Sequence, residues 1–311
     1  MQTRKTASVS NSLNRSAVAP RGGTTVGALV NELASTLALA GITDPRDAAR
    51  DIVAALAGVP RYWTITNSAG VLDPQSADAA RRSAQRLAAG APFAYSVGIA
   101  QFRKLNLHID ERALIPRPET EILVEEILER FRARSSGGDW GTAVDVGTGS
   151  GAIALSLAAE GSFARVIATD ASLDALDVAK TNVALAAEML RCPVELRAGS
   201  LLAPLKDITA SLLVSNPPYV AFDEMLDLPA SVRNWEPPAA LASGSNGLAM
   251  TAAIVQDGVS LLEPGGILAL EVDERRASLV AELVMSRGGY TDVGVVLDLT
   301  GRERFVFASR A

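Results

Sequence analysis

Cysteine and histidine are almost absent from this sequence of 311 residues. Cys192 is its single cysteine and His108 its single histidine. One cysteine cannot form an internal disulfide or a cysteine-rich zinc site, and it suits a reducing compartment. A catalytic triad, a His-Cys dyad or a multi-histidine metal centre would each need His108, whose surroundings have the pattern of a strand surface. We therefore expect no metal site and no nucleophile activated by histidine.

Excess positive charge and long apolar runs are also missing. The 29 Lys and Arg against 35 Asp and Glu give a net charge of −6. A surface of this sign does not attract phosphate backbones, so we expect no direct nucleic-acid binding. No run reaches the roughly 18 apolar residues that cross a bilayer. We expect a soluble cytoplasmic monomer without a membrane partner.

Residues 1–31 lack acidic side chains altogether. This segment is rich in serine and contains four basic residues, Arg4, Lys5, Arg15 and Arg21. Such a composition is typical of organelle transit peptides. Because Pro20 and the Gly22-Gly23 pair read as a linker, we interpret residues 1–23 as a disordered tail, with organellar import as the alternative.

The apolar content, 48% of all residues, is sufficient for a core, and the length indicates one large domain with a smaller one. In residues 24–90, apolar side chains recur at the spacing of a helix face, beginning with Val26, Leu29, Val30, Leu33 and Leu37. A second helix is expected from Pro45 to Leu56, and a third is opened by Asp73 and Pro74. The pattern predicts a domain of helices only, which we interpret as a substrate-recognition domain.

Beyond residue 90 the apolar period shortens to two. Alternation between Phe93 and Ile115 predicts a β-hairpin linker over residues 91–118. Residues 119–311 mostly alternate helices with strands, which are expected at 143–147, 165–169, 193–197, 211–215 and 266–272. Two closing strands, at 292–297 and 303–308, have no helix between them. We predict an α/β fold with a mainly parallel sheet, covered on both faces and extended by one antiparallel strand.

A glycine-rich turn lies where the first strand of this sheet meets a helix. The segment Asp145–Ala152 contains Gly147, Gly149 and Gly151, which let the backbone approach a ligand and direct helix amides at its anionic end. Asp170 ends the next strand, where an acid can hold ribose hydroxyls. The pattern is compatible with NAD, with S-adenosylmethionine, or with a tight turn that binds nothing.

A second motif, Asn216-Pro217-Pro218-Tyr219, follows the apolar strand at 211–215. At the carboxyl edge of an open sheet it faces the same crevice as the glycine turn. The two prolines remove two N–H donors and leave carbonyl acceptors beside the Asn216 oxygen. Asn216 Oδ1 and the Pro217 carbonyl can accept both protons of a planar NH2 group and turn its nitrogen toward an electrophile, with Tyr219 as a wall. We favour this interpretation over an ordinary turn.

Together with the segment Ile115–Glu121, these motifs resemble the HemK/PrmC family, the glutamine N5-methyltransferases that modify class I peptide chain release factors. The likeness extends over residues 24–311 and includes Trp235-Glu236-Pro237 and Leu270-Glu271-Val272. Asn-Pro-Pro-Tyr is shared with adenine and guanine amino-methyltransferases, whereas the Pro-Arg-Pro-Glu-Thr-Glu segment is narrow to this family. The resemblance implies a Rossmann-like, seven-stranded class I methyltransferase domain over residues 119–311.

The resemblance also implies roles for individual residues. It assigns S-adenosylmethionine binding to Asp145, Gly147, Thr148, Gly149, Ser150, Gly151, Asp170, Leu201 and Asn216, with Leu201 in place of an aromatic contact to adenine. It assigns the target glutamine, in a Gly-Gly-Gln sequence, to Asn216, Pro217, Pro218 and Tyr219, with Arg117 and Glu119 beside it. Asn216, Pro217 and Tyr219 are then catalytic, the amide nitrogen attacks the sulfonium methyl, and S-adenosylhomocysteine leaves.

The sequence departs from the family pattern on the substrate side. Pro238 stands where Arg is usual, Asn246 where Asp is usual, and Thr251 where a Tyr is usual. Asp273 follows Leu-Glu-Val, where Gly is usual. A loop with fewer basic and aromatic contacts leaves the exact protein substrate open, although the residues assigned to methyl transfer are intact.

Other functions share part of these features. A flipped nucleic-acid base offers the same planar NH2 group, but such an enzyme needs a basic groove or a target-recognition domain. An NAD-dependent dehydrogenase explains the glycine turn and not Asn-Pro-Pro-Tyr. Methylation of another protein glutamine, and a non-catalytic adaptor built on a methyltransferase fold, stay open.

Overall fold

The computed structural model of the chain describes residues 23–134 and 138–311. Met1–Ala89 and Gly90–Ala311 form two compact units, each held by its own internal contacts. The tail predicted over residues 1–23 lies outside the described residues except for Gly23. Among the residues that the structure describes, no helix is both long and apolar enough to cross a membrane.

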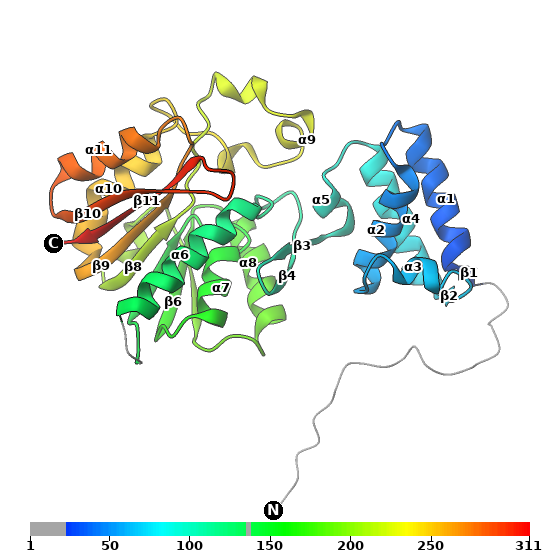
Figure 1. The fold of residues 1–311 in the computed structure, drawn as a ribbon, viewed down its shortest axis with the longest axis horizontal. Coiled ribbons are helices and arrows are strands. Elements are labelled where there is room, and N and C mark those ends of the chain that lie inside the picture. The colour runs from blue at the N-terminus through cyan, green and yellow to red at the C-terminus, as the bar shows by residue number, and fades with distance from the viewer. Residues whose placement is uncertain (1–22, 135–137) are drawn as a thin grey trace, which may run out of the picture. The chain divides into compact units, whose positions relative to one another are not determined.

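The first unit is built from helices (Figure 1). Their bounds are α1 Val26–Leu39, α2 Pro45–Ala57, α3 Trp63–Thr66 and α4 Pro74–Ala88. The predicted helix starts are confirmed: Thr25 accepts a hydrogen bond from Ala28 N, and Asp73 accepts one from Ser76 N. The five apolar residues expected on one face of α1 are all buried.

The expectation of helices only is wrong in one detail. Strand β1 (Thr24–Thr25) pairs antiparallel with β2 (Val71–Leu72) in the first unit. Two residues are too few for a period-two pattern to be visible in the sequence, because alternation needs about four residues to be recognised.

The predicted hairpin is present, as β3 (Ile99–Phe102) and β4 (Leu105–His108). Its expected first residues are instead a short helix, α5 (Phe93–Val97). Ser96 N donates to the Pro92 carbonyl, and Gly98 closes the turn at φ 74°. Proline before a segment and a left-handed glycine after it are the boundaries of a helix, so these two residues override the alternating pattern.

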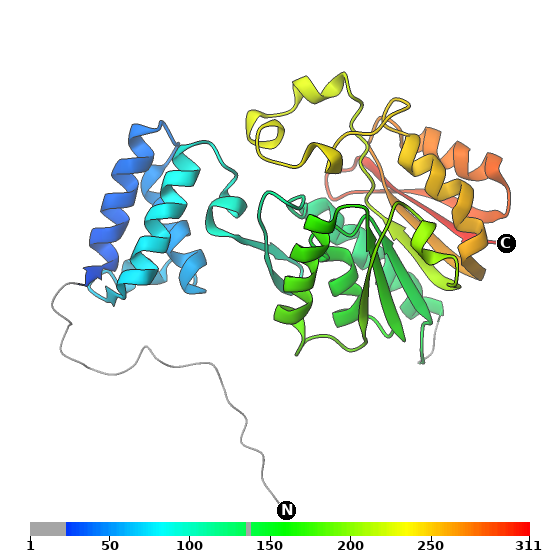
Figure 2. The same ribbon diagram turned by 180° about the vertical axis from the view of Figure 1, so that it is seen from behind.

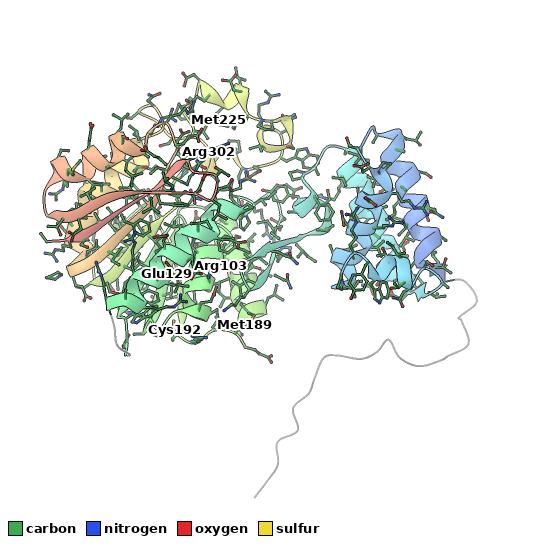
Figure 3. The ribbon with its side chains drawn as sticks, in the orientation of Figure 1. Arg103, Glu129, Met189, Cys192, Met225 and Arg302 are labelled. Atoms are coloured by element: carbon green, nitrogen blue, oxygen red, sulfur yellow. The ribbon has the colours of Figure 1, made fainter. Side chains whose placement is uncertain are left out.

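The hairpin tip is tied to the helices by Arg103 (Figure 3). Its guanidinium donates to Glu160 at 2.7 Å and to the Glu121 carbonyl at 3.0 Å. Since Glu160 ends helix α7 (Ala152–Glu160) and Glu121 lies in helix α6 (Pro118–Arg134), one side chain joins the hairpin to two helices. The hairpin is therefore part of the larger unit.

The larger unit contains the predicted seven-stranded α/β sheet (Figure 2). Its strands are β5 Thr142–Val146, β6 Arg165–Asp170, β7 Val194–Ala198, β8 Ala210–Ser215, β9 Leu262–Glu271, β10 Tyr290–Leu297 and β11 Glu303–Arg310. The order across the sheet is β10-β11-β9-β8-β5-β6-β7, and β11 is antiparallel to both of its neighbours. Strand β9 begins four residues before the predicted 266, because Leu262 pairs with Ala210 ahead of a register shift.

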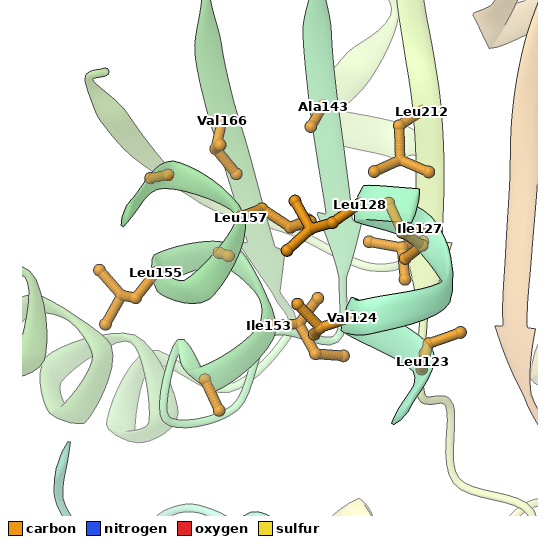
Figure 4. Close-up of a cluster of buried hydrophobic side chains, with 14 of the residues drawn as sticks. Leu123, Val124, Ile127, Leu128, Ala143, Ile153, Leu155, Leu157, Val166 and Leu212 are labelled. Atoms are coloured by element: carbon orange, nitrogen blue, oxygen red, sulfur yellow. The ribbon is translucent and has the colours of Figure 1, made fainter. Parts of the chain in front are cut away.

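Helices cover both faces of the sheet. Their bounds are α6 Pro118–Arg134, α7 Ala152–Glu160, α8 Leu173–Ala186, α10 Ala249–Leu261 and α11 Ala277–Arg287. Apolar residues of α6 and α7 pack on one face (Figure 4), and those of α10 and α11 pack on the other. Short helices fill the loops: η1 Ala203–Leu205, η2 Glu224–Asp227, α9 Ala230–Arg233 and η3 Pro238–Ala240.

Candidate active site

The register of the sheet brings the two sequence motifs together. Val146 of β5 pairs with Ser215 of β8, and Ser215 pairs with Leu270 of β9. These strands are parallel, so the next residue of each lies on the same carboxyl edge. Those residues are Gly147, Asn216 and Glu271.

One cavity opens at this edge. Seven of the predicted site residues line it: Gly147, Gly149, Asp170, Leu201, Asn216, Pro217 and Pro218. The other predicted residues, Asp145, Thr148, Ser150, Gly151, Tyr219, Arg117 and Glu119, are not among its described lining residues. The glycine turn and the Asn-Pro-Pro segment thus face the same space.

The glycine turn depends on backbone conformations that glycine adopts easily. Gly147 and Gly149 have φ of 74° and 56°, and a Cβ on either would meet no atom within 4 Å. Gly151 differs, because its Cβ would lie 3.3 Å from Leu155 and 3.5 Å from Ala179. The first two glycines therefore leave open space beside the cavity, while the third permits close helix packing.

Asp145 lies under the turn and is fully buried. Its Oδ2 accepts hydrogen bonds from Thr148 Oγ1 at 2.6 Å and from Ala154 N at 3.2 Å. Its Oδ1 has no hydrogen-bond partner among the described residues. Burial raises the pKa of Asp145 to about 7, against the two hydrogen bonds, which lower it. Asp145 and Thr148 thus shape the turn from inside.

Asp170 ends β6 and lines the cavity. Its Oδ2 accepts from Gly149 N at 2.9 Å, and its Oδ1 accepts from Ser172 N at 2.9 Å. Each carboxylate oxygen has more than one acceptor position. Asp170 can therefore hold the glycine turn in place and still accept hydrogen bonds from the hydroxyl groups of a ligand.

Asn182 is a residue that sequence reasoning missed. It is fully buried in α8 and donates to the carbonyls of Ser150 and His108, at 2.9 and 3.0 Å. Its Oδ1 accepts from His108 N at 2.7 Å. Asn182 therefore couples the glycine turn to strand β4, and the only signal for it in the sequence is a polar residue on the apolar face of a helix.

Leu201 lines the cavity with an unusual backbone, at φ 51°. A non-glycine residue in this region is uncommon, and for a bulky one the conformation is strained. The apolar side chain packs at the edge of the cluster formed with α10 and α11.

Asn216 is hydrogen-bonded to the first of two buried residues, Thr120 and Glu271. Its Nδ2 donates to Thr120 Oγ1 at 3.3 Å, and Thr120 Oγ1 donates to Glu271 Oε2 at 2.7 Å. Burial raises the pKa of Glu271 to about 7, while the Thr120 hydrogen bond and Arg304 lower it. The sequence placed both residues in motifs without assigning them a role. With its nitrogen directed at Thr120, Asn216 turns its oxygen to the other side of the carboxamide.

Partial burial raises the pKa of Tyr219 to about 12, with a smaller contribution from Glu271. Tyr219 therefore stays neutral at physiological pH. Its carbonyl lies against Gly247, where a Cβ would come within 2.2 Å of the oxygen at φ 83°. The loop that departs from the family pattern thus packs directly on this motif.

Backbone hydrogen bonds also join the segment after Tyr219 to residues 241–243. Val220 N donates to the Leu241 carbonyl at 3.0 Å, and Ser243 N donates to the Val220 carbonyl at 2.8 Å. Asn246, one of the departures, adopts φ 57°, a left-handed conformation that asparagine tolerates.

Arg117 pairs with Glu236 at 2.6 Å, while Glu119 is exposed in the first turn of α6. The Glu236 side chain is only 1% exposed, and its Oε2 has no hydrogen-bond partner among the described residues. Pro237 follows it and lines the cavity. Glu236 is thus an anchor for the cavity wall that sequence reasoning did not identify.

Asp273 acquires a role that the sequence did not indicate. Its Oδ2 accepts a hydrogen bond from Arg275 at 2.7 Å and forms an ion pair with Arg276. Arg276 also donates a hydrogen bond to Glu224 at 2.7 Å. Glu224 in turn accepts from Ala221 N at 3.0 Å. This chain of contacts fixes the segment that follows Tyr219.

The buried carboxyl group of Asp145 predicts a pH-dependent stability. The ligand-free folded protein keeps this proton up to about pH 7, whereas an unfolded aspartate releases it near pH 4. This group therefore lowers the free energy of unfolding by about 1.4 kcal/mol for each pH unit as pH rises through that window. Asp145→Asn keeps an acceptor for Thr148 and cannot titrate, so we expect it to lose less stability than wild type between pH 5 and pH 7, by about 1–3 kcal/mol.

Urea unfolding at both pH values measures this difference. Glu271 titrates in both proteins and cancels in the comparison. Parallel stability profiles for the two proteins would contradict the burial of an uncompensated carboxyl at residue 145.

Comparisons with known proteins agree with this geometry. The models described as PrmC N-terminal domain and Methyltransferase small domain match residues 28–98 and 118–228. The chain is 36% identical to the "Release factor glutamine methyltransferase" of Rhodopirellula baltica, over 87% of this chain and 91% of that protein. The protein of the same name from Moorella thermoacetica is 37% identical, over 90% and 97%.

A solved structure shares the fold. The hMettl16 catalytic domain in complex with MAT2A 3'UTR hairpin 6 has a TM-score of 0.51 at 16% identity, covering 77% of this chain and 82% of that one. At this identity the likeness concerns the fold alone, which is the predicted class I methyltransferase sheet. The sequence identity to the two relatives above shows that the chain belongs to the release factor glutamine methyltransferase family.

Proposed function

We propose that this protein transfers the methyl group of S-adenosylmethionine to the side-chain amide nitrogen of a glutamine in a peptide chain release factor. By the family resemblance, the target is the Gly-Gly-Gln glutamine of class I factors. The observation that carries this proposal is that Gly149 and Asn216 line one cavity. Such a factor is a cytoplasmic protein, so we place the reaction in the cytoplasm and expect a monomer to carry it out.

The cavity suits the methyl donor. Gly147 and Gly149 leave space where side chains would stand, and Asp170 has acceptors for ribose hydroxyls. Leu201 offers an apolar surface to the adenine. S-adenosylmethionine supplies the sulfonium-bound methyl group. Asp145, Thr148, Ser150 and Gly151 are not among the described residues that line the cavity, so we expect them to support the turn that surrounds the donor.

Asn216 and Pro217 would hold the acceptor. Asn216 Oδ1 and the Pro217 carbonyl accept the two N–H groups of the glutamine amide, so its nitrogen turns toward the methyl group. A C–N bond forms as the S–C bond breaks, S-adenosylhomocysteine leaves, and the nitrogen gives one proton to solvent. The donor is already activated, so alignment supplies most of the rate, an effect that can reach about 7 to 11 kcal/mol.

The test is transfer of a labelled methyl group. The protein is incubated with labelled S-adenosylmethionine and, separately, a class I release factor, a ribosomal protein, DNA and RNA. We expect label only on the release factor, at the glutamine of Gly-Gly-Gln. Label on nucleic acid or on another protein would overturn the proposed substrate.

Asn216→Ala tests the role of the amide acceptor in the same assay. We expect turnover to fall at least about 100-fold, because alignment of the nitrogen is lost, while calorimetry still detects S-adenosylmethionine binding. Asn106→Ala, an exposed asparagine on β4, serves as the matched control and keeps wild-type activity. Full turnover in Asn216→Ala would mean that the amide is held elsewhere.

Gly247→Ala tests whether the neighbouring loop sets the position of Tyr219. The added Cβ lies 2.2 Å from the Tyr219 carbonyl oxygen, so the motif must move, and we expect turnover to fall about 10- to 100-fold. Gly244→Ala is the control in the same loop, since its Cβ meets only Ala249 at 3.8 Å. Equal activity of the two variants in the methyl-transfer assay would refute the coupling.

We further propose that residues 24–90 recognise the protein substrate, that residues 91–118 link them to the catalytic part, and that residues 119–311 carry out methyl transfer. Residues 1–89 and 90–311 each have their own internal contacts. Deletion of residues 1–89 should raise KM for the release factor at least about tenfold while S-adenosylmethionine affinity changes less than about twofold. Calorimetry and initial rates measure both, and an equal loss of both would count against this division of roles.

A further inference from the structure

Behind Asn216 lies a polar pair that methyl transfer as proposed does not use. Thr120, at the start of α6, is 4% exposed, and Glu271, at the end of β9, is 1% exposed. Neither is among the described residues that line the cavity, whereas Asn216 is one of them. The hydrogen bond from Asn216 to Thr120 connects this pair to the cavity.

The hydrogen bonds among these three residues have a definite direction. An ionised carboxylate only accepts, so the single hydroxyl hydrogen of Thr120 is directed to Glu271 Oε2. The Thr120 oxygen can then only accept, and the part of Asn216 facing it must be the NH2 group. The remaining part of the carboxamide, Oδ1, is consequently the one available to the substrate amide.

We propose that Thr120 and Glu271 are positioning residues for the methyl transfer: ionised Glu271, acting through Thr120, sets which end of the Asn216 carboxamide faces the substrate. This inference rests on the proposed function. A buried carboxylate beside a neutral hydroxyl is costly for stability on its own. Its effect on the orientation of Asn216 accounts for its presence at this edge of the sheet.

Protonation of Glu271 reverses the direction of the hydrogen bonds that join Glu271, Thr120 and Asn216. A protonated Glu271 donates to Thr120, and the Thr120 hydroxyl hydrogen is then directed to Asn216, which presents its oxygen. The NH2 group of Asn216 now faces the NH2 group of the substrate, and two donors cannot pair. Turnover should therefore decline as pH falls, by about tenfold per unit below the pKa of Glu271, which burial raises to about 7.

Several other groups act on Glu271 and are retained in the test. They are Arg304 on β11, Glu119 and Arg117 at the start of α6, and Tyr219 after β8. Arg304 and Arg117 favour the ionised form, and Glu119 opposes it. Burial raises the pKa of Asp145 to about 7 as well, so the acid limb is assigned to Glu271 by its loss in Glu271→Gln, in which Asp145 still titrates.

The test compares kcat, with both substrates saturating, from pH 5.5 to 8.5. We expect an acid limb near pH 7 in wild type and in Thr120→Ser, which keeps the hydroxyl. Thr120→Val should lower kcat at least about tenfold at pH 8 while S-adenosylmethionine affinity changes less than about twofold. Glu271→Gln, whose carbonyl can accept from Thr120 but cannot titrate, should show a flat profile.

Thr169→Val is the matched control, because Thr169 is fully buried and its hydroxyl has no hydrogen-bond partner among the described residues. It should retain the wild-type kcat and pH profile. Unchanged kcat in Thr120→Val, or an acid limb that persists in Glu271→Gln, would overturn the proposal.

A measurement without turnover separates this inference from the proposed function. In NMR spectra of the full chain, the Glu271 carboxyl carbon and the Asn216 side-chain amide should titrate together in wild type, and the Asn216 response should vanish in Thr120→Val. An Asn216 amide that ignores Glu271 overturns the inference whatever the enzyme methylates. A coupled titration in a protein that fails to methylate release factor overturns the proposed function and leaves the orientation of Asn216 by Glu271 standing.

Discussion

The register of three parallel strands is the constraint on which the site depends. Pairing of Val146 with Ser215, and of Ser215 with Leu270, aligns the residues that follow on a single edge of the sheet. A one-residue slip would turn the side chains of a strand to the opposite face. The apolar clusters on the two faces, one under α6 and α7 and one under α10 and α11, specify this register because each requires its own set of strand residues.

Buried carboxylates do much of the shaping around the cavity. Asp145 supports the glycine turn, Glu236 anchors the wall through Arg117, and Glu271 bonds to Thr120. Burial raises the pKa values of Asp145 and Glu271 toward neutrality, and the hydrogen bonds from neutral hydroxyls only partly oppose this rise. Glu236 instead faces a guanidinium. A buried carboxyl group thus serves as a hydrogen-bond acceptor or as an ion-pair partner, depending on which side chain the fold places beside it.

Two of the departures from the family pattern, Asn246 and Asp273, lie in segments that contact the chain after Asn216. Asn246 lies in the loop whose Gly247 packs on the Tyr219 carbonyl, and Asp273 belongs to the ionic contacts that reach Glu224 after that motif. Substitutions at these positions therefore affect how the segment after Asn216 is supported.

The sequence alone was sufficient for the seven strands, the helices that alternate with them, the glycine turn and the Asn-Pro-Pro-Tyr motif, because apolar period, glycine and proline act on neighbouring residues. It did not reveal the β1–β2 pair, helix α5, or the partners of Asn216. Thr120 lies 96 residues from Asn216 and 151 from Glu271 along the chain. Only the tertiary structure decides such contacts, since the direction of a buried hydrogen bond depends on which distant groups the packing of the sheet and α6 brings within reach.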